Sequence, residues 1–331
     1  MTALSPATVL AGSADRHADT VAVIDGRVRV TYAELWLEAR CYGAGLRAAG
    51  VRGGDAVALL APNVVDFPRV YFGALAAGAV AVPVGVPVGP QAVQLAREAR
   101  LLVCHTSHLA AGRRISARAG VPLLTVGPSR GPSDVPRLED LGDVPPGRTG
   151  GFADTDLDPA GRTEVDPDDT DVVLGCLPLG GRFGQAITLT GTFRAGATLV
   201  LLGRFTGPAA LDLMLREQVT VFHGTSAMYA ALLDAARGRD SLPRLRRWVS
   251  RAPLPPSLRQ RFTSTFDTVV HVAEGERDSS GRPDASTGRG RVGPDGEWWF
   301  DPRPVRPRCR CCGAVPIAVR AVPAPSPTIR P

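Results

Sequence analysis

Apolar runs alternate with amphipathic stretches over most of the first 272 positions, and each change of pattern predicts a new element. Helical spacing predicts helices over 31–46 and 67–77. Short apolar runs in the same half predict strands at 55–60, 80–84, 101–104 and 122–126, with a further helix between the last two. Because strands that alternate with helices at this spacing form parallel βαβ units, the pattern predicts an α/β fold.

The first of these helices has a recognisable start. Thr31 precedes the apolar run, and Glu34 follows it at the spacing of a capping box. Gly50 is expected to end the helix soon after Leu46.

The alternation fails between residues 127 and 170, which are rich in Pro, Gly, Asp and Arg, and it resumes at Asp171. The second half is predicted to contain strands at 172–177, 198–202, 219–222, 247–250 and 268–272, with helices at 185–194, 208–217, 226–236 and 257–262. We therefore predict a first α/β subdomain at 1–126, a linker or long loop at 127–170, a second α/β subdomain at 171–272, and an irregular Pro/Gly/Arg-rich tail at 273–331.

Composition narrows the chemistry, because all 38 basic residues are arginine and lysine is absent. A phosphate-loop lysine, a lysine Schiff base and a lysine general base are thereby excluded. Arginine can hold a phosphate but does not lose its proton near neutral pH. Richness in arginine, alanine and glycine also indicates a GC-rich genome, so codon bias accounts for part of the absence.

The formal net charge of +6 is spread along the chain, with the densest basic cluster at Arg244, Arg246 and Arg247. Few aromatic residues accompany that cluster, so it is interpreted as a solvated face and no nucleic-acid partner is expected. The uncharged run 71–96 is interrupted by glycine and proline, which favours a helix and a buried strand over a membrane span. The start of the chain does not resemble a signal peptide, and a cytoplasmic location is expected.

Cysteines and histidines offer little evidence for a metal or catalytic centre. Cys41, Cys104 and Cys176 lie in apolar surroundings and are expected to be reduced core residues. The tail cysteines Cys309, Cys311 and Cys312 have no nearby histidine and lack the paired spacing of a zinc site, so no metal is expected there.

The histidines of the first half and one glycine pattern in the tail do not predict a catalytic or dinucleotide site. His105 and His108 are not at metal spacing on an evident helix face, and no Ser, His and Asp segments suggest a catalytic triad. The glycine pattern at 288–293 leads into a Pro-Asp-Gly turn and not a helix, so it does not predict a dinucleotide site.

Several segments, taken together, resemble the acyl-adenylate-forming (AMP-binding) ligases, which include acyl-CoA synthetases and the adenylation domains of peptide synthetases. Their order and spacing carry the resemblance, which covers most of residues 5–272. The segments are 31–35, 54–63, 74–84, Leu177-Pro178-Leu179, 194–198, 219–224 followed by Met228-Tyr229, and 252–255. The resemblance implies an incomplete acyl-CoA synthetase-like N-terminal domain built of layered βαβ units, without a match to the C-terminal lid domain.

The departures from the family concern its nucleotide chemistry. The family's Ser/Thr/Gly-rich loop, which ends in Pro-Lys-Gly and wraps the ATP phosphates, should follow Asp166-Pro167-Asp168-Asp169-Thr170. Here Thr170 runs directly into residues that resemble the sequence after that loop, so the loop and adjoining elements look deleted. The lid domain that would carry the second lysine has no match.

By resemblance, degenerate nucleotide-binding positions are Ser250, Ala252, Pro253, Glu274, Glu276 and Thr287. Arg251 stands within the first of these motifs, where its side chain would compete with adenine for space. Arg289 replaces the family's ribose-binding aspartate and can only donate hydrogen bonds. The resemblance places the substrate pocket at Phe183, His223 and Gly224, although a simply packed histidine is favoured at 223.

The preferred hypothesis is a degenerate ligase homologue that does not adenylate, with no catalytic residue, and that binds an acyl compound or acts as the partner of an intact paralogue. One alternative is a residual acid–thiol ligase completed in trans, for which ATP, magnesium and coenzyme A would be the cofactors. The other is a non-functional gene remnant.

Overall fold

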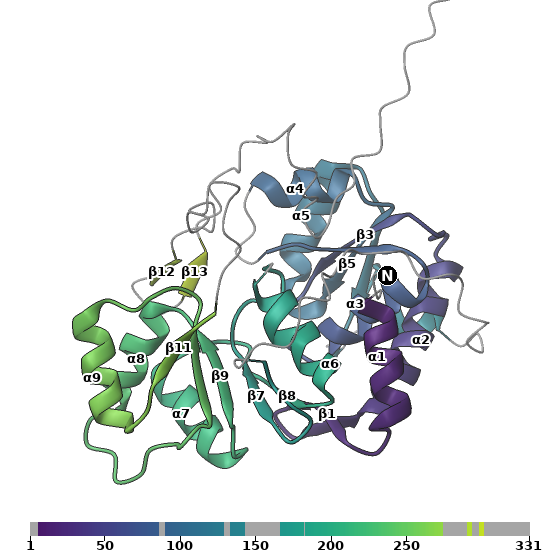
Figure 1. Ribbon diagram of the computed structural model, residues 1–331. Helices are drawn as coiled ribbons and strands as arrows, with labels where there is room; N and C mark the ends of the chain where they lie inside the picture. The colour runs from purple at the N-terminus through teal and green to yellow at the C-terminus, as the bar shows by residue number, and fades with distance from the viewer. Residues whose placement is uncertain are drawn as a thin grey trace, which may run out of the picture.

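The computed structural model describes residues 6–85, 90–128, 133–142, 166–181, 183–273, 290–292 and 298–300, and it has the predicted layered α/β architecture (Figure 1). A seven-stranded sheet has the order β11-β10-β9-β7-β8-β1-β2, in which only the β1–β2 pair is antiparallel. Its strands are β1 (Val21–Asp25), β2 (Val28–Thr31), β7 (Val172–Gly175), β8 (Thr198–Leu201), β9 (Val221–Gly224), β10 (Arg247–Ser250) and β11 (Val270–Val272).

A second sheet is entirely parallel, in the order β4-β3-β5-β6. Its strands are β3 (Ala56–Leu60), β4 (Val80–Pro83), β5 (Leu101–His105) and β6 (Leu123–Val126). A short antiparallel pair, β12 (Gly290–Val292) and β13 (Trp298–Phe300), lies within the tail that was predicted to be irregular.

The helices form layers around and between the two large sheets. One apolar cluster joins α7, α8 and α9 to the seven-stranded sheet, another joins α1, α2, α3 and α6 to both sheets, and a third joins α4 and α5 to the far face of the four-stranded sheet. The helices are α1 (Pro6–Arg16), α2 (Tyr32–Ala48), α3 (Asp66–Ala76), α4 (Pro90–Arg97), α5 (Leu109–Ala119), α6 (Thr192–Ala195), α7 (Gly207–Arg216), α8 (Ser226–Ala236) and α9 (Pro256–Phe266), with short turns η1 (Thr106–His108) and η2 (Glu139–Leu141).

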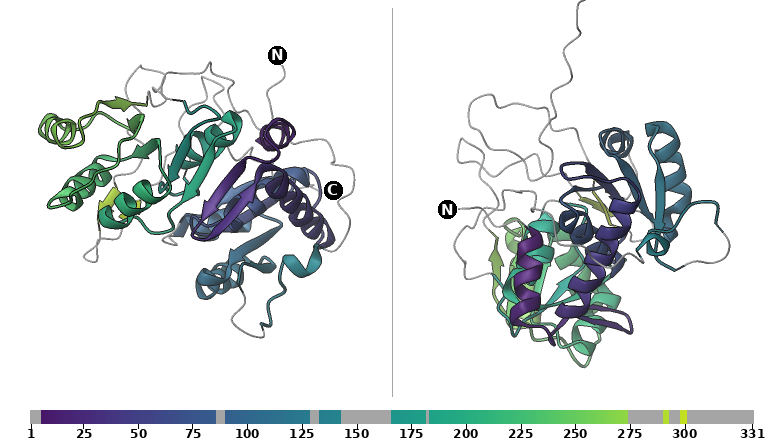
Figure 2. Two further views of the ribbon diagram at one scale, coloured as in Figure 1. Left: turned by 90° about the horizontal axis from the view of Figure 1, so that it is seen from below. Right: turned by 90° about the vertical axis from the view of Figure 1, so that its right-hand side faces the viewer.

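The predicted division of the chain does not coincide with the division between sheets. The hairpin β1–β2 belongs to the predicted first subdomain, yet β1 pairs with β8 of the second, through Val23 and Leu199 (Figure 2). Part of the predicted linker also packs into the first half. Leu138 is fully buried, and its N–H donates to the Thr125 carbonyl at 2.8 Å.

Close packing between α2 and α3 depends on two glycines. A Cβ added at Gly43 would lie 2.7 Å from the Gly73 carbonyl oxygen, and one added at Gly73 would lie 2.9 Å from the Ala39 carbonyl oxygen. Both distances are too short for a side chain, so only glycine lets the two helices approach this closely.

The capping box predicted for α2 is confirmed. The Glu34 N–H donates to Thr31 Oγ1 at 3.2 Å, and the Thr31 N–H donates to the Glu34 carboxylate at 2.8 Å. Each contact satisfies a backbone donor that the first helical turn leaves without a partner.

Replacement of Thr31 by alanine is therefore expected to lower the free energy of unfolding by about 1 kcal/mol. Chemical denaturation followed by tryptophan fluorescence would measure the change. Thr225 offers a matched control, because it occupies the N-cap of α8 without a side-chain capping hydrogen bond. An equal loss in Thr225→Ala would show that the Thr31 capping hydrogen bond adds nothing specific.

Two other sequence predictions concern a membrane span and the cysteines of the described residues. None of the helices in the described ranges is both long and apolar enough to cross a membrane. The uncharged run 71–96 instead includes the second half of α3, the whole of β4 and most of α4. Cys41, Cys104 and Cys176 are free, although Cys41 is only half-buried. Burial raises the pKa of both the Cys104 and the Cys176 thiols to about 12, so neither is a reactive thiolate near neutral pH.

Candidate functional site

Those residues assigned by resemblance that the structure describes lie in or directly beside the strands of the seven-stranded sheet, toward one of its edges. Strands β7, β9, β10 and β11 are parallel, so their carboxyl ends meet at the same edge. Ligands of open α/β sheets bind in the crevice outside such ends. The loops that leave this edge begin at Cys176, Thr225, Arg251 and Ala273.

The segment after β10 is held tightly by hydrogen bonds. Ser250 is fully buried, and its hydroxyl donates to the Ala252 carbonyl at 2.6 Å. The Arg251 N–H donates to the Gly224 carbonyl at 3.1 Å, while the Ala273 N–H donates to the Ser250 carbonyl at 2.9 Å. Ala252 and Pro253 are exposed. These contacts fix the backbone from which the Arg251 side chain extends.

Arg251 reaches across the edge to a residue assigned to the substrate pocket. Its guanidinium carbon lies 5.6 Å from the centre of the Phe183 ring, within the range of a cation–π contact. The two side chains therefore contact each other between β10 and the segment that follows β7. The structure brings together one position of the expected nucleotide motif and one of the expected acyl pocket.

Phe183 is placed by an unusual helix. Sequence analysis predicted an ordinary helix over 185–194, whereas the chain forms a π-helix η3 (Gly184–Gly191) that continues into α6. Phe183 is the N-cap residue of η3. Wide helical turns of this kind occur frequently at functional sites, and the spacing of apolar residues alone cannot distinguish them from an α-helix.

His223 lies inside β9 and is fully buried. Neither ring nitrogen has a hydrogen-bond partner within the described part of the chain. Burial lowers the pKa of His223 to about 4, even though the negative charges of Asp166 and Asp171 act in the opposite direction. A neutral, packed imidazole is the result.

Gly224 ends β9 beneath an aromatic cluster. A Cβ at this position would lie 2.3 Å from the Phe222 ring and 3.2 Å from the Tyr229 ring. The bare backbone thus lets Phe222 and Tyr229 pack edge to face, with ring centroids 5.4 Å apart. A packing role accounts for this glycine. The remaining assigned positions, Glu274, Glu276 and Thr287, lie outside the described residues.

Asn63 is a residue whose role sequence analysis missed. It follows β3 of the four-stranded sheet and is buried. Its amide nitrogen donates to the carbonyls of Gly175 and Leu177 at 3.1 and 2.8 Å, and its amide oxygen accepts from the Leu179 N–H at 3.0 Å. Asn63 therefore ties one sheet to the loop at the candidate site. The signal for this role in the sequence was that Asn63 is the single asparagine of the chain.

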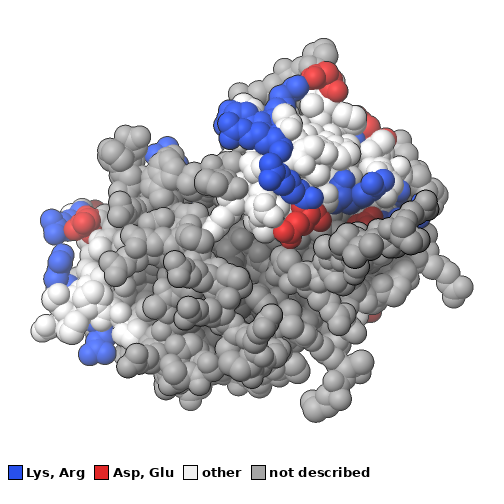
Figure 3. Space-filling view, turned by 90° about the horizontal axis from the view of Figure 1, so that it is seen from above, with Lys and Arg blue, Asp and Glu red and all other residues white. Residues whose placement is uncertain are grey.

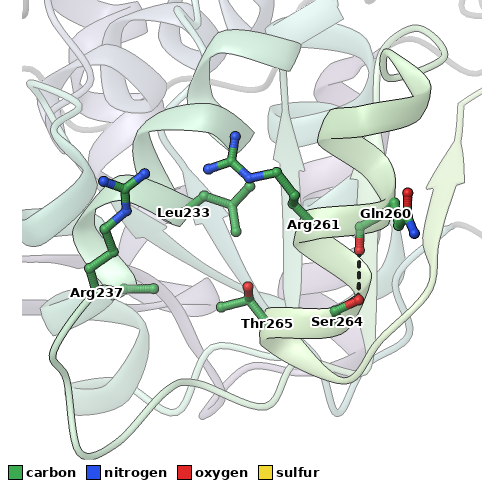
Figure 4. A pocket seen from close by; sticks show the side chains of 7 residues that line it. Leu233, Arg237, Gln260, Arg261, Ser264 and Thr265 are labelled. Carbon is green, nitrogen blue, oxygen red and sulfur yellow. Dashed lines mark hydrogen bonds between the residues drawn. The ribbon is translucent and has the colours of Figure 1, made fainter.

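A separate pocket lies away from this edge, between the C-terminal halves of α8 and α9 (Figure 4). Its volume is about 380 Å³. Leu233 and Ala236 form its apolar part, and the guanidinium groups of Arg237 and Arg261 stand at its rim. The rim residues are exposed, and Arg237 also pairs with Asp234 at 3.2 Å. None of the residues assigned from the sequence lines this pocket.

Surface charge in the described part of the chain is mixed. Figure 3 shows basic side chains on the upper face with acidic ones among them. Arg113 of α5 pairs with Asp134, and Arg246 of the predicted basic cluster pairs with Asp168 at 2.6 Å. Arg246 and Arg247 also contact the buried Asp171. Two of the three arginines in that cluster are thus engaged within the protein.

Curated proteins with similar sequences include CoA synthases and CoA ligases. A feruloyl-CoA synthase of Amycolatopsis sp. is 32% identical over 263 residues, which cover 73% of this chain and 53% of the relative. The 4-coumarate–CoA ligase 3 of Oryza sativa subsp. japonica is 26% identical over 284 residues, covering 75% and 51%. The chain thus spans about half the length of these relatives. Phenyloxazoline synthase MbtB of Mycobacterium tuberculosis matches over only 73 residues, at 41% identity.

Solved structures show the same fold. The anthranilate CoA ligase AuaEII superposes with a TM-score of 0.70 at 17% identity, covering 91% of this chain and 78% of that protein. The benzoate CoA ligase of Burkholderia xenovorans superposes with a TM-score of 0.67 at 22% identity, covering 82% and 61%. The family model described as AMP-binding enzyme matches residues 10–125 and 153–275. This chain is therefore a member of the AMP-binding enzyme family, with the fold of the N-terminal domain of adenylate-forming ligases.

Proposed function

We propose that this chain is a family member that has lost acyl adenylation and that it binds an acyl compound or serves as the partner of an intact paralogue in the cytoplasm. The observation that carries the proposal is the contact of Arg251 with Phe183. The Arg251 guanidinium lies against the Phe183 ring of the expected acyl pocket. By resemblance, the Arg251 side chain stands where an adenine ring would lie, so the two would compete for this space.

The amino-acid sequence also favours a loss of adenylation. It contains no lysine and no recognisable phosphate loop, and preorganised charge supplies most of the stabilisation in phosphoryl-type chemistry. Loss of a single contact of this kind costs about 2.7–4 kcal/mol in comparable sites, so the combined loss is expected to abolish turnover.

Calorimetric titration of the full chain with ATP and Mg²⁺ tests the proposal. No micromolar binding is expected, while the benzoate CoA ligase of Burkholderia xenovorans serves as the positive control. Micromolar binding by this chain would overturn the proposal.

Removal of the obstructing side chain should partly open the site. Arg251→Ala is expected to bind AMP at least about fivefold more tightly than the unchanged chain, because stacking of a base on an aromatic ring contributes about 1–3 kcal/mol. Ligand-detected NMR can follow this weak binding. Arg237→Ala is the matched control, because Arg237 is an exposed arginine outside the carboxyl edge. Equal AMP affinity in both variants would mean that Arg251 does not obstruct the site.

A residual acid–thiol ligase completed in trans is the alternative that an activity assay addresses. It requires ATP-dependent pyrophosphate exchange with some carboxylic acid. The acid panel should begin with aromatic acids, because the relatives are named for feruloyl, coumarate, benzoate and anthranilate groups. Exchange above background, with or without a cell extract as the source of missing parts, would favour this alternative.

The gene-remnant alternative makes a physical prediction of its own. A remnant without a completed core should be poorly soluble and should unfold without a cooperative transition. The described residues instead form continuous apolar clusters across both sheets, which favours a folded protein. A cooperative thermal transition of the purified chain would exclude the remnant.

A further inference from the structure

A second group of polar side chains lies at the carboxyl edge of the four-stranded sheet, apart from the site at the seven-stranded sheet. His105 ends β5, and Ser107 follows within η1. The Ser107 hydroxyl oxygen lies 2.7 Å from His105 Nδ1, and His105 Nε2 lies 3.6 Å from Asp66 Oδ2 at the start of α3. This serine–histidine–aspartate series is not evident in the sequence, because Asp66 comes from a different βαβ unit.

The backbone selects the tautomer of His105. The Ser107 N–H donates to His105 Nδ1 at 3.2 Å, so Nδ1 carries a lone pair. The hydrogen of the neutral ring is then on Nε2, which faces the Asp66 carboxylate. Nδ1 is therefore the acceptor nitrogen, which the backbone N–H and the hydroxyl of Ser107 both approach within hydrogen-bond distance. This division of roles, with one nitrogen toward a hydroxyl and the other toward a carboxylate, is that of a nucleophile–base–carboxylate triad.

The carboxylate is buried and held in place. The side chains of Asp66 and His105 are 9% and 10% exposed. Arg69 binds Asp66 at 3.0 Å and is itself held by two hydrogen bonds to Glu38. Burial acts to raise the pKa of Asp66, but the contacts with His105 and Arg69 outweigh it and keep that pKa below its usual range. Asp66 is thus ionised and oriented toward the imidazole.

Gly127 leaves room for the histidine and the carboxylate to meet. This residue follows β6 with φ of +95°, and a Cβ there would lie 2.5 Å from His105 Nε2 and 3.1 Å from Asp66 Oδ2. Any side chain would press into the contact between the two groups. A histidine that only capped η1 would require neither a buried carboxylate at its far nitrogen nor this cleared space.

Ser107 is accessible to solvent, and it lies where negative charge on its hydroxyl oxygen is stabilised. It is exposed, whereas its two supporting groups are buried. The eleven-residue helix α5 begins two positions later, so its positive end lies close to the hydroxyl oxygen. His108 Nδ1 lies 2.8 Å from the same oxygen. The positive end of α5 favours negative charge developing on Ser107 Oγ.

We propose that Ser107 is a nucleophile toward small activated acyl esters, with His105 as its general base and Asp66 as the carboxylate that orients His105. Ser107 Oγ attacks the carbonyl carbon while its proton passes to His105 Nδ1, and that proton then leaves with the departing alcohol. Water, deprotonated by His105, attacks the acyl-serine and releases the acid, and the proton returns to Ser107. No redox partner or cofactor is required.

Labelling of the full chain with a fluorophosphonate probe, followed by peptide mass mapping, tests the proposal. Ser107 is expected to be labelled at least ten times faster than exposed Ser264 of α9, and hydrolysis of p-nitrophenyl acetate should be lost in Ser107→Ala. Labelling of Ser107 no faster than that of Ser264 would overturn the proposal. This comparison is made within the unchanged chain and does not depend on the folding of any variant.

Two variants distinguish a general-base role of His105 from a purely structural role as the N-cap residue of η1. His105→Gln and Gly127→Ala are each expected to slow labelling of Ser107 at least tenfold, the first by removing the base and the second by displacing it from Asp66. Ser264→Ala is the matched control and should leave the rate unchanged. If the His105→Gln chain melts at the unchanged temperature and labels at the unchanged rate, His105 is only a cap and the proposal fails.

Discussion

Asp171→Ala is expected to lower the free energy of unfolding by about 3 kcal/mol, since removal of one partner from a buried ion pair leaves the other charge uncompensated. Asp171 is only 1% exposed. It accepts hydrogen bonds from the Asp168 N–H at 2.9 Å, from Thr220 Oγ1 at 2.6 Å and from Arg247 at 3.0 Å, and it also contacts Arg246. The estimate lies at the low end of the usual range because both arginines are partly exposed and can recover some hydration.

Urea denaturation followed by tryptophan fluorescence, to which buried Trp248 contributes, would measure this loss. Asp169→Ala is the matched control, because Asp169 is an exposed neighbour in the same turn, and its change should stay within about 0.5 kcal/mol. Asp171→Asn keeps the size and one acceptor oxygen, so an intermediate loss is expected. Indistinguishable values for Asp171→Ala and Asp169→Ala would show that the buried carboxylate contributes nothing to stability.

Acidification from pH 7 to pH 4 is expected to remove about 3 kcal/mol of folding stability through His223 alone. The pKa of His223 is about 4 in the folded chain, below its ordinary value of 6.5, because burial penalises the charged ring. As the pH falls below 6.5, the unfolded chain takes up the proton first and is stabilised relative to the folded chain. The contribution of neutral His223 to folding stability is therefore present above pH 6.5 and is lost progressively toward pH 4.

His223→Leu isolates this contribution from that of the carboxylates. Free energies of unfolding should be measured for both proteins between pH 4 and pH 8. The difference between them should be constant above pH 7 and should grow in favour of the variant below pH 6.5. Above pH 7, the variant is expected to be no less stable, because the imidazole nitrogens make no hydrogen bond with the described residues. Parallel pH profiles for the two proteins would contradict a buried neutral imidazole.

The fold was predictable where the evidence is local. The start of α2 could be predicted from Thr31 and Glu34, because a capping box involves residues only three positions apart. The hairpin β1–β2 was missed, although Val28-Arg29-Val30 alternates and Asp25-Gly26 favours a tight turn. Its pairing with β8 depends on residues from the other half of the chain, and periodicity carries no information on such a partner.

The resemblance identified segments that lie at the ends of the strands, but it did not predict the contacts between their side chains. Resemblance placed Arg251 beside the expected adenine position. Its partner Phe183 lies 68 positions earlier in the chain, at the N-cap of a π-helix that the sequence did not predict. His105 and Ser107 are neighbours in sequence, whereas Asp66 and Gly127 reach them only through the order of strands in the four-stranded sheet.

The pairing of β1 with β8 constrains the order in which the molecule can be built during synthesis. The four-stranded sheet is complete once β6 has left the ribosome, but β1 must wait for β8, and the Ser13 hydroxyl must wait for a carbonyl that lies 180 residues later. Until then, β1 presents an unpaired strand edge to other nascent chains. The N-terminal hairpin is therefore open to pairing with strands of other chains during synthesis, and translation that stops before β8 would yield an aggregation-prone fragment.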